Sequence, residues 1–244
     1  MKTRTFSVVA FAAVSGIAAI AQADPQYTVV NAPPGAELGH PAILSNMYGG
    51  TWGASGVHVT NGTHGAMRVM DAGASAGMSI PVAAPELAQD DVWAGNLVSV
   101  AVRARYAGDS HIFGWIDDTA AEPAFAPIIS THTLNSPVML EVSSNFRWAL
   151  HNTSTGLMFT SAPWSNAGVG SRSAETFDQL VTYHVTGPSG LSEIALFWED
   201  RIGGQSADYD YNDAVITIAA VPAPGAGALA AIGLIGLAGS RRRK

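Results

Sequence analysis

Short apolar runs separated by turns recur along the chain and predict β-strands. The most regular run extends from Val98 to Tyr106, where apolar residues occupy every second position and polar residues or alanine lie between them. Alternation with a period of two is typical of a strand with one buried face. The run from Ile194 to Trp198 is apolar at nearly every position. It therefore predicts a central strand that is covered on both faces.

Further segments of the same kind continue the series. They are His111 to Ile116, Leu140 to Leu150 with Phe146, Trp148 and Leu150 on one face, Leu157 to Thr160, and Val181 to Val185. The Asn61-Gly62 dipeptide between two short strand-like runs is a hairpin signal. One short helix is expected at Pro41 to Met47. Because no helical periodicity extends beyond about two turns, we expect an all-β fold, an antiparallel β-sandwich or jelly roll.

The most specialised stretch is Phe197 to Ile218, in which a strand leads into an acidic turn and then into a second strand. The turn contains five carboxylates and one asparagine close together, and Arg201 is its single cation. Neighbouring carboxylates repel one another by about 1 kcal/mol or more at a protein surface. A folded turn of this composition therefore needs a counter-charge.

Calcium fits this turn because it is bound by carboxylate, amide and carbonyl oxygens, whereas zinc prefers His or Cys. The candidate ligands are Glu199, Asp200, Asp208, Asp210, Asn212 and Asp213. The loop is not a helix-loop-helix calcium motif, because that motif requires Gly at its sixth position and Glu at its twelfth. We predict a structural calcium site in a turn between strands, residues 199–213, with Gly203 and Gly204 supplying flexibility. A solvated acidic hairpin without metal is the alternative.

The same residues resemble a family of bacterial surface domains of unknown function. These domains have a signature F-x-E-D followed by D-x-D-Y-N-D in their last two strands, and the resemblance covers roughly residues 180–220. The matching positions are Phe197, Glu199, Asp200, Asp208, Asp210, Tyr211, Asn212 and Asp213. Calcium binding is what the resemblance implies for this turn.

The amino-terminal segment, residues 1–23, has the three parts of a secretory signal peptide. Lys2 and Arg4 precede an apolar run, and Ala21 and Ala23 form a small-x-small pattern for signal peptidase. This arrangement is typical of an exported protein.

The carboxyl-terminal segment, residues 221–244, has a proline motif, an apolar run and a basic end. The motif is Val221, Pro222, Ala223 and Pro224, and the basic cluster is Arg241, Arg242 and Arg243 with Lys244. The segment resembles the PEP-CTERM sorting signal, although the usual Pro-Glu-Pro is replaced by Pro-Ala-Pro. The resemblance implies transient insertion of a transmembrane helix into the inner membrane, and then cleavage by an exosortase-type transpeptidase. A permanent anchor with a single span is the alternative.

Residues 24–220, the region between the two terminal segments, have a net charge that excludes some classes of binding partner. All 19 acidic residues of the chain lie there together with six arginines, which gives a formal charge of −13, although the whole chain carries −7. Such a surface repels nucleic acid and anionic membranes. The chain has no cysteine, so stability must come from the core rather than from disulfides, and the predicted metal would add to it.

Enzymatic motifs have little support. Gly73-Ala74-Ser75-Ala76-Gly77 matches the nucleophile elbow, but no strand–turn–helix context surrounds it. The histidines, at positions 40, 58, 64, 111, 132, 151 and 184, show no zinc-site spacing. We therefore expect no catalytic residues and interpret Trp148 and Trp198 as core residues. Trp164 lies in an expected loop, which keeps a calcium-dependent carbohydrate-binding module open as an alternative.

The sequence therefore predicts an exported, non-enzymatic protein of the cell surface or extracellular matrix, with a structural calcium ion. Its expected partners are signal peptidase, an exosortase-type enzyme and an extracellular polysaccharide, but not nucleic acid. A hydrolase that uses Ser75 is the other alternative class.

Overall fold

The computed structural model describes residues 29–53, 57–69, 78–79, 90–120, 122–142, 144–166, 178–202 and 207–221. Over these ranges the chain forms two sheets and one α-helix, α1 (His40–Tyr48). The signal-peptide segment and most of the carboxyl-terminal sorting segment lie outside the described residues. Within the described ranges, no helix combines the length and apolar composition that a membrane span requires.

The large sheet contains seven strands in the order β1-β2-β11-β12-β13-β5-β8, and every pairing is antiparallel. Its strands are β1 (His58–Thr60), β2 (Gly65–Arg68), β5 (Leu97–Arg105), β8 (Val138–Glu141), β11 (Leu180–Thr186), β12 (Ser192–Trp198) and β13 (Ala214–Ala220). β12 lies at the centre and all but its first residue are buried. The prediction of a central strand at Ile194 to Trp198 is therefore confirmed.

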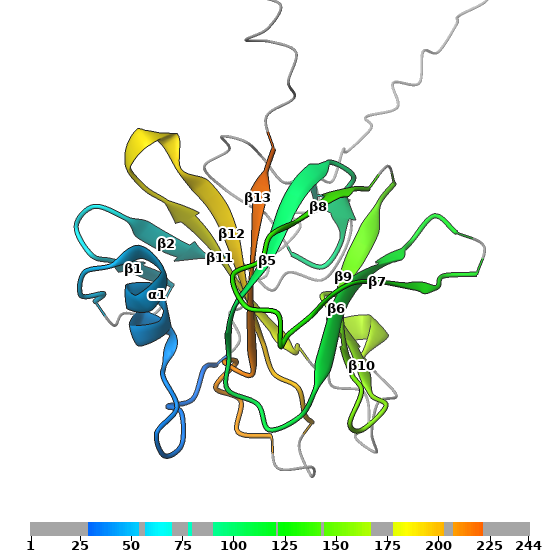
Figure 1. The fold of residues 1–244 in the computed structure, drawn as a ribbon, viewed down its shortest axis with the longest axis horizontal. Helices are drawn as coiled ribbons and strands as arrows, with labels where there is room; N and C mark the ends of the chain where they lie inside the picture. Colours follow the sequence, from blue (N-terminus) through cyan, green and yellow to red (C-terminus); the bar gives the residue numbers. More distant parts are fainter. Residues whose placement is uncertain are drawn as a thin grey trace, which may run out of the picture.

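The small sheet packs against one face of the large one (Figure 1). It has the order β3-β4-β9-β6-β7, with β10 also paired to β9. Its strands are β3 (Met78–Ser79), β4 (Trp93–Ala94), β6 (His111–Asp117), β7 (Phe125–Ser130), β9 (Phe146–Asn152) and β10 (Met158–Thr160). Two short 3-10 helices, η1 (Pro163–Ser165) and η2 (Pro188–Gly190), lie in connections. The fold is thus a β-sandwich, as the alternating strands predict.

The core between the sheets is rich in aromatic side chains. Trp148 and Trp198 are fully buried there, as expected, and Phe113 stacks on Trp148 with the ring centroids 5.1 Å apart. Phe146 packs edge-on to the same tryptophan. Large rings bury much apolar area for each residue ordered, so this cluster contributes strongly to stability in a chain without cysteine.

The opposite face of the large sheet is covered by α1 (Figure 1). Ile43 and Leu44 of the helix pack with Trp52 and with side chains of β11, β12 and β13, among them Tyr183 and Phe197. The helix lies within one residue of the segment that the sequence predicts. The central strands are consequently buried on both faces, which explains their continuous apolar sequence.

Two details of the strand prediction are wrong. The segment Leu140 to Leu150 is not one strand, because it contains the end of β8 in the large sheet and most of β9 in the small sheet. The alternation from Val98 to Tyr106 does not stay on one face either. A register shift in the pairing of β5 with β13 points Val102 into the core between the sheets and turns Ala104 towards α1. A bulge of this kind inserts one residue and reverses the alternation.

The hairpin predicted at Asn61-Gly62 is present. β1 and β2 pair antiparallel around it, and Gly62 has a positive φ of 88°. The Asn61 side-chain oxygen accepts hydrogen bonds from the backbone N–H groups of Thr63 and His64. Asparagine is favoured in such turns because its side chain satisfies nearby backbone donors.

Candidate metal centre

The acidic turn connects β12 to β13 at one end of the large sheet. The last pair of this hairpin is Trp198 with Ala214, so Glu199 and Asp213 leave the sheet as neighbours. The backbone N–H of Asp200 donates a hydrogen bond of 2.8 Å to the Asp213 side chain. Strand pairing therefore brings together carboxylates that are separated by more than ten residues in the sequence.

The structure gathers the acidic side chains into two groups of three. In each group, one carboxylate oxygen from every residue lies within 4.8 Å of the others. The first group is Glu199, Asp200 and Asp213, and the second is Glu37, Asp208 and Asp210. Five of these six residues belong to the ligand set that the sequence predicts.

All of the first group and two residues of the second line one cavity of about 150 Å³, which we call the acidic pocket. Among the described residues, its walls carry five carboxylates and one cation, Arg201. The carboxylates belong to Glu37, Glu199, Asp200, Asp208 and Asp213. The volume is small compared with the roughly 300 to 1,000 Å³ of typical sites for organic ligands. The pocket therefore suits an ion with a few waters better than a substrate.

The carboxylates of this pocket cannot all be ionised without cost. Burial, followed by the charges of Asp213 and Asp208, raises the pKa of Glu199 to about 9. Burial and the charge of Asp200 raise the pKa of Asp213 to about 8. Both groups thus hold protons near neutral pH unless a cation replaces them.

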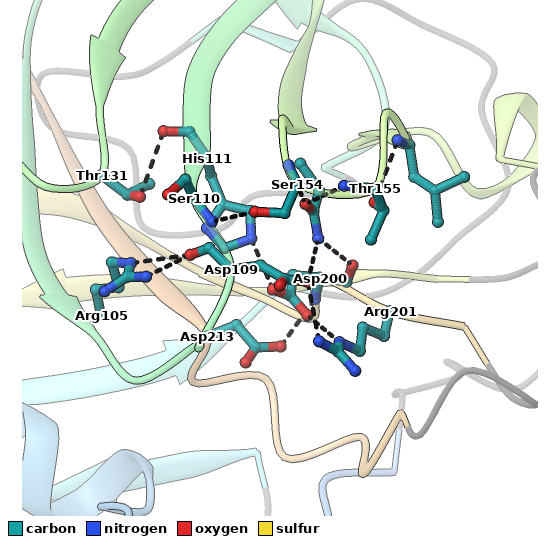
Figure 2. Close-up of polar contacts among 12 residues, drawn as sticks. Arg105, Asp109, Ser110, His111, Thr131, Ser154, Thr155, Asp200, Arg201 and Asp213 are labelled. Carbon is teal, nitrogen blue, oxygen red and sulfur yellow. Dashed lines mark hydrogen bonds and ion pairs between the residues drawn. The ribbon is translucent and has the colours of Figure 1, made fainter.

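A set of hydrogen bonds behind the pocket holds Asp200 in place. Figure 2 shows Asp200 among His111, Asp213 and Arg201. The fully buried His111 donates from Nε2 to the Asp200 carboxylate at 2.6 Å. Arg201 lies 3.7 Å from the same carboxylate and donates to Asp109 at 3.0 Å. Asp200 therefore presents its oxygens in a defined orientation.

The returning half of the turn has an unusual backbone. Tyr209 and Tyr211 have positive φ values of 58° and 56°, a conformation that costs a bulky residue about 1 to 3 kcal/mol. The contacts that hold this segment include a hydrogen bond of 2.8 Å from the Tyr209 N–H to Glu199. The Tyr211 hydroxyl also donates to the backbone oxygen of Asp178. The conformation thus depends directly on one of the pocket carboxylates.

Asp210 and Asn212 do not line the acidic pocket. The Asn212 amide donates to Asp210 at 2.7 Å and to the backbone oxygen of Leu38 at 3.2 Å. His40 of α1 donates from Nε2 to the backbone oxygen of Asp210 at 2.9 Å, and burial lowers the pKa of His40 to about 4. These two predicted ligands therefore attach the turn to α1 and to the segment that precedes it.

Three residues of this region were not predicted. Glu37 lies in a proline-rich segment more than 160 positions before the turn, and no spacing connects the two. His111 was interpreted as an ordinary strand histidine, and Asp109 was not singled out. Nothing in the local sequence marks these two residues. His111 is the first residue of β6 and Asp109 lies two positions before it, and only tertiary contacts bring them to the acidic turn.

Several predicted features lie outside the described residues. They are the cleavage residues Ala21 and Ala23, the sorting residues Pro222, Ala223, Pro224, Arg241, Arg242 and Arg243, the linker Gly203-Gly204, the Ser75 motif and the side chain of Trp164. Val221 is described, and its N–H donates to the backbone oxygen of Leu97 directly after β13.

The donor set of the pocket limits its chemistry. Every group offered by the two acidic triplets is a carboxylate, which suits a hard cation. The imidazole Nε2 of His111 already contacts Asp200, so it stabilises a ligand rather than acting as one. Comparison with protein-family models, with curated proteins and with solved structures finds no match for this chain.

Proposed function

We propose that this chain is an exported, non-enzymatic protein of the cell surface or extracellular matrix, and that a structural calcium ion closes its β12–β13 turn. The observation that carries this proposal is the acidic pocket, where five carboxylates from two distant parts of the chain share about 150 Å³. Arg201, which also lines the pocket, offsets only part of this charge, so protons or a bound cation must neutralise the rest.

Calcium is the cation that the donors favour. It accepts 6 to 8 oxygen ligands in irregular geometry, whereas magnesium requires a near-ideal octahedron and zinc prefers nitrogen or sulfur. Carboxylates of Glu199, Asp200 and Asp213 supply the ligands closest to the sheet, and Glu37 and Asp208 lie across the pocket. Calcium bound there would tie the segment before α1 to the β12–β13 turn.

A structural role fits the position of the pocket better than catalysis does. The turn connects the two central strands of the large sheet, and its conformation includes two tyrosines with positive φ. An ion that neutralises Glu199 would support the turn through the Tyr209 hydrogen bond. The proposal therefore assigns the ion to stability.

Export and sorting are supported by the two terminal sequences. Residues 1–23 fit a substrate of signal peptidase, and residues 221–244 resemble a PEP-CTERM signal that an exosortase-type transpeptidase would process. The proposed destination is the cell surface or matrix, with extracellular polysaccharide as a partner. Intact mass of the protein recovered from its native cells tests the sorting, and a species that ends at Lys244 contradicts it.

Thermal unfolding of the full-length protein tests the calcium site. At a calcium concentration tenfold above Kd the fold should gain about 1.4 kcal/mol, which corresponds to a rise in Tm of roughly 3 to 6 °C. Magnesium at the same concentration should produce a smaller rise.

Two variants, each of which neutralises one carboxylate, test whether the calcium response depends on the pocket. Asp208→Asn removes a half-buried carboxylate from the pocket and should reduce the calcium response. Glu141→Gln removes an exposed carboxylate on β8 and should leave the response unchanged. Identical melting curves in calcium and in chelator for the wild-type protein would show that the turn is only a solvated acidic hairpin.

A further inference from the structure

A second and larger cavity, of about 430 Å³, lies between α1 and the end of β5. We call it the arginine cleft. Its walls come from α1, from the end of β5 and the residue after it, from the Leu134-Asn135 loop and from Glu193 of β12. The volume lies within the roughly 300 to 1,000 Å³ of small-molecule sites, so the cleft can hold an organic ligand.

The cleft carries positive charge on a strongly acidic protein. Arg103 and Arg105 both line it, and Glu193 is the one carboxylate among the described residues of its walls, which gives them a formal charge of +1. The other arginines that the structure describes are not available in this way, since Arg68 and Arg147 are buried and Arg201 lies among acidic groups. The cleft therefore favours a ligand group with a single negative charge, while the −13 of residues 24–220 disfavours densely charged polyanions such as nucleic acid.

The charged groups of the cleft are held in position before any ligand arrives. Glu193 accepts a hydrogen bond of 2.6 Å from the Tyr48 hydroxyl and lies 3.5 Å from the Arg103 guanidinium. Arg103 also donates from Nε to Thr217 at 2.8 Å. Arg105 donates from Nε to the backbone oxygen of Asp109 at 3.2 Å. Fixed guanidinium groups bind carboxylates with little loss of side-chain entropy.

The remaining walls combine hydrogen-bonding groups with apolar surface. The exposed Asn46 and Asn135 carry amides that both donate and accept hydrogen bonds. Met47, Leu134 and the half-buried Tyr106 contribute apolar surface. A ligand with many hydroxyl groups and C–H faces matches this combination, because each hydroxyl both donates and accepts.

We propose that the arginine cleft binds a saccharide unit that carries one carboxylate, such as a uronic acid. Arg103 and Arg105 hold the carboxylate, Asn46 and Asn135 contact ring hydroxyls, and Tyr106 packs against a C–H face of the sugar. This site is distinct from the acidic pocket, although Tyr106 lines both cavities. Saccharide binding does not require the metal, so it should persist in chelator, and the two proposals can fail separately.

Isothermal titration of the full-length protein in chelator tests the cleft, with glucuronate, a digalacturonate and neutral glucose as probes. The two uronates should bind at least roughly tenfold more tightly than glucose, because the guanidinium contacts require the carboxylate. Comparison of the monomer with the dimer distinguishes a free sugar acid from a unit of a polymer. Uronate affinity should also fall as salt is added.

Matched variants separate the cleft from general charge effects. Asn46→Asp places a carboxylate on an exposed position of α1 and should weaken uronate binding severalfold, whereas Asn145→Asp makes the same change before β9 and should not. Arg105→Gln should weaken it roughly tenfold with glucose binding unchanged. The proposal is overturned if the uronates do not bind, or if glucose binds with equal affinity. It is also overturned if a simple peptide carboxylate binds more tightly than the uronates, or if the two aspartate variants have equal effects.

Discussion

The acidic pocket and the arginine cleft have Tyr106 as a common wall but balance their charges in opposite ways. In the pocket, like charges face one another, and the pKa of Glu199 rises to about 9 as a result of burial and repulsion. In the cleft, Tyr48, Glu193 and Arg103 form a chain of complementary contacts.

This difference indicates how each cavity depends on a ligand. A pocket whose own groups repel one another needs protons or a cation for the turn to fold, so its ligand contributes directly to stability. A cleft whose groups are already paired folds without a ligand and keeps a small surplus of charge for recognition. We therefore expect changes in the pocket to alter stability and changes in the cleft to alter affinity.

The largest expected effect comes from removing two pocket charges together. Glu199→Gln with Asp213→Asn keeps oxygen acceptors for the N–H groups of Tyr209 and Asp200. The double variant should lose the calcium response of roughly 3 to 6 °C in Tm. In chelator at pH 9 it should be more stable than the wild type, because the repulsion is gone. The control replaces two exposed carboxylates, Glu122→Gln with Glu141→Gln, and a matching loss of response there would contradict the assignment.

The next largest expected effect is on the pH dependence of stability in the absence of calcium. Glu199 and Asp213 have pKa values of about 9 and 8 in the fold, against ordinary values of 4.5 and 3.8. The fold binds these protons more tightly than the unfolded chain does. Their contribution to the free energy of unfolding is therefore complete below about pH 4 and is lost as pH rises through 8 to 9. Tm measured in chelator should therefore fall between pH 6 and pH 9.

Calcium should oppose this fall, since it competes with the same protons and binds more tightly as they dissociate. Calcium affinity measured by titration should rise over the same pH range. A metal-free Tm that is constant from pH 6 to pH 9 would mean that the two carboxylates are already ionised and neutralised by other groups.

The smallest expected effect is in the cleft. Glu193→Gln raises the formal charge of the cleft from +1 to +2 and keeps an oxygen that accepts the Tyr48 hydrogen bond. Uronate affinity should increase about threefold from the added Coulomb attraction. Stability should change by less than about 1 kcal/mol, because the Arg103 partner is partly exposed. Weaker uronate binding in a titration would indicate that Glu193 itself contacts the sugar.

Local patterns predicted the elements whose residues contact near neighbours in sequence. The Asn61-Gly62 hairpin depends on one side chain that accepts hydrogen bonds from Thr63 and His64. Helix α1 lies between Gly39 and Gly49 and has a proline in its first turn. The buried position of β12 could also be predicted, because a strand covered on both faces is apolar throughout. These features are determined by residues within a few positions of one another.

Predictions that required long-range geometry were incomplete. Alternation from Val98 to Tyr106 indicated one buried face, yet the bulge opposite Val215 turns the last part of the strand towards α1. β7 was not predicted at all, and its sequence from Phe125 to Ser130 shows weak alternation. The register of β5 is set by its pairing with β13. The sequence of β5 alone does not determine where the register shift occurs.

The candidate metal site also combines features that local sequence predicts with features that depend on long-range packing. The sequence by itself determined that five carboxylates would crowd one turn and need a counter-charge, because their spacing along the chain keeps them close in any compact fold. Only the tertiary structure decided which oxygens face one cavity. Strand pairing placed Glu199 beside Asp213, the segment before α1 added Glu37, and β6 placed His111 behind Asp200. Contacts between residues more than 80 positions apart follow from how the sheets pack, and no local pattern encodes them.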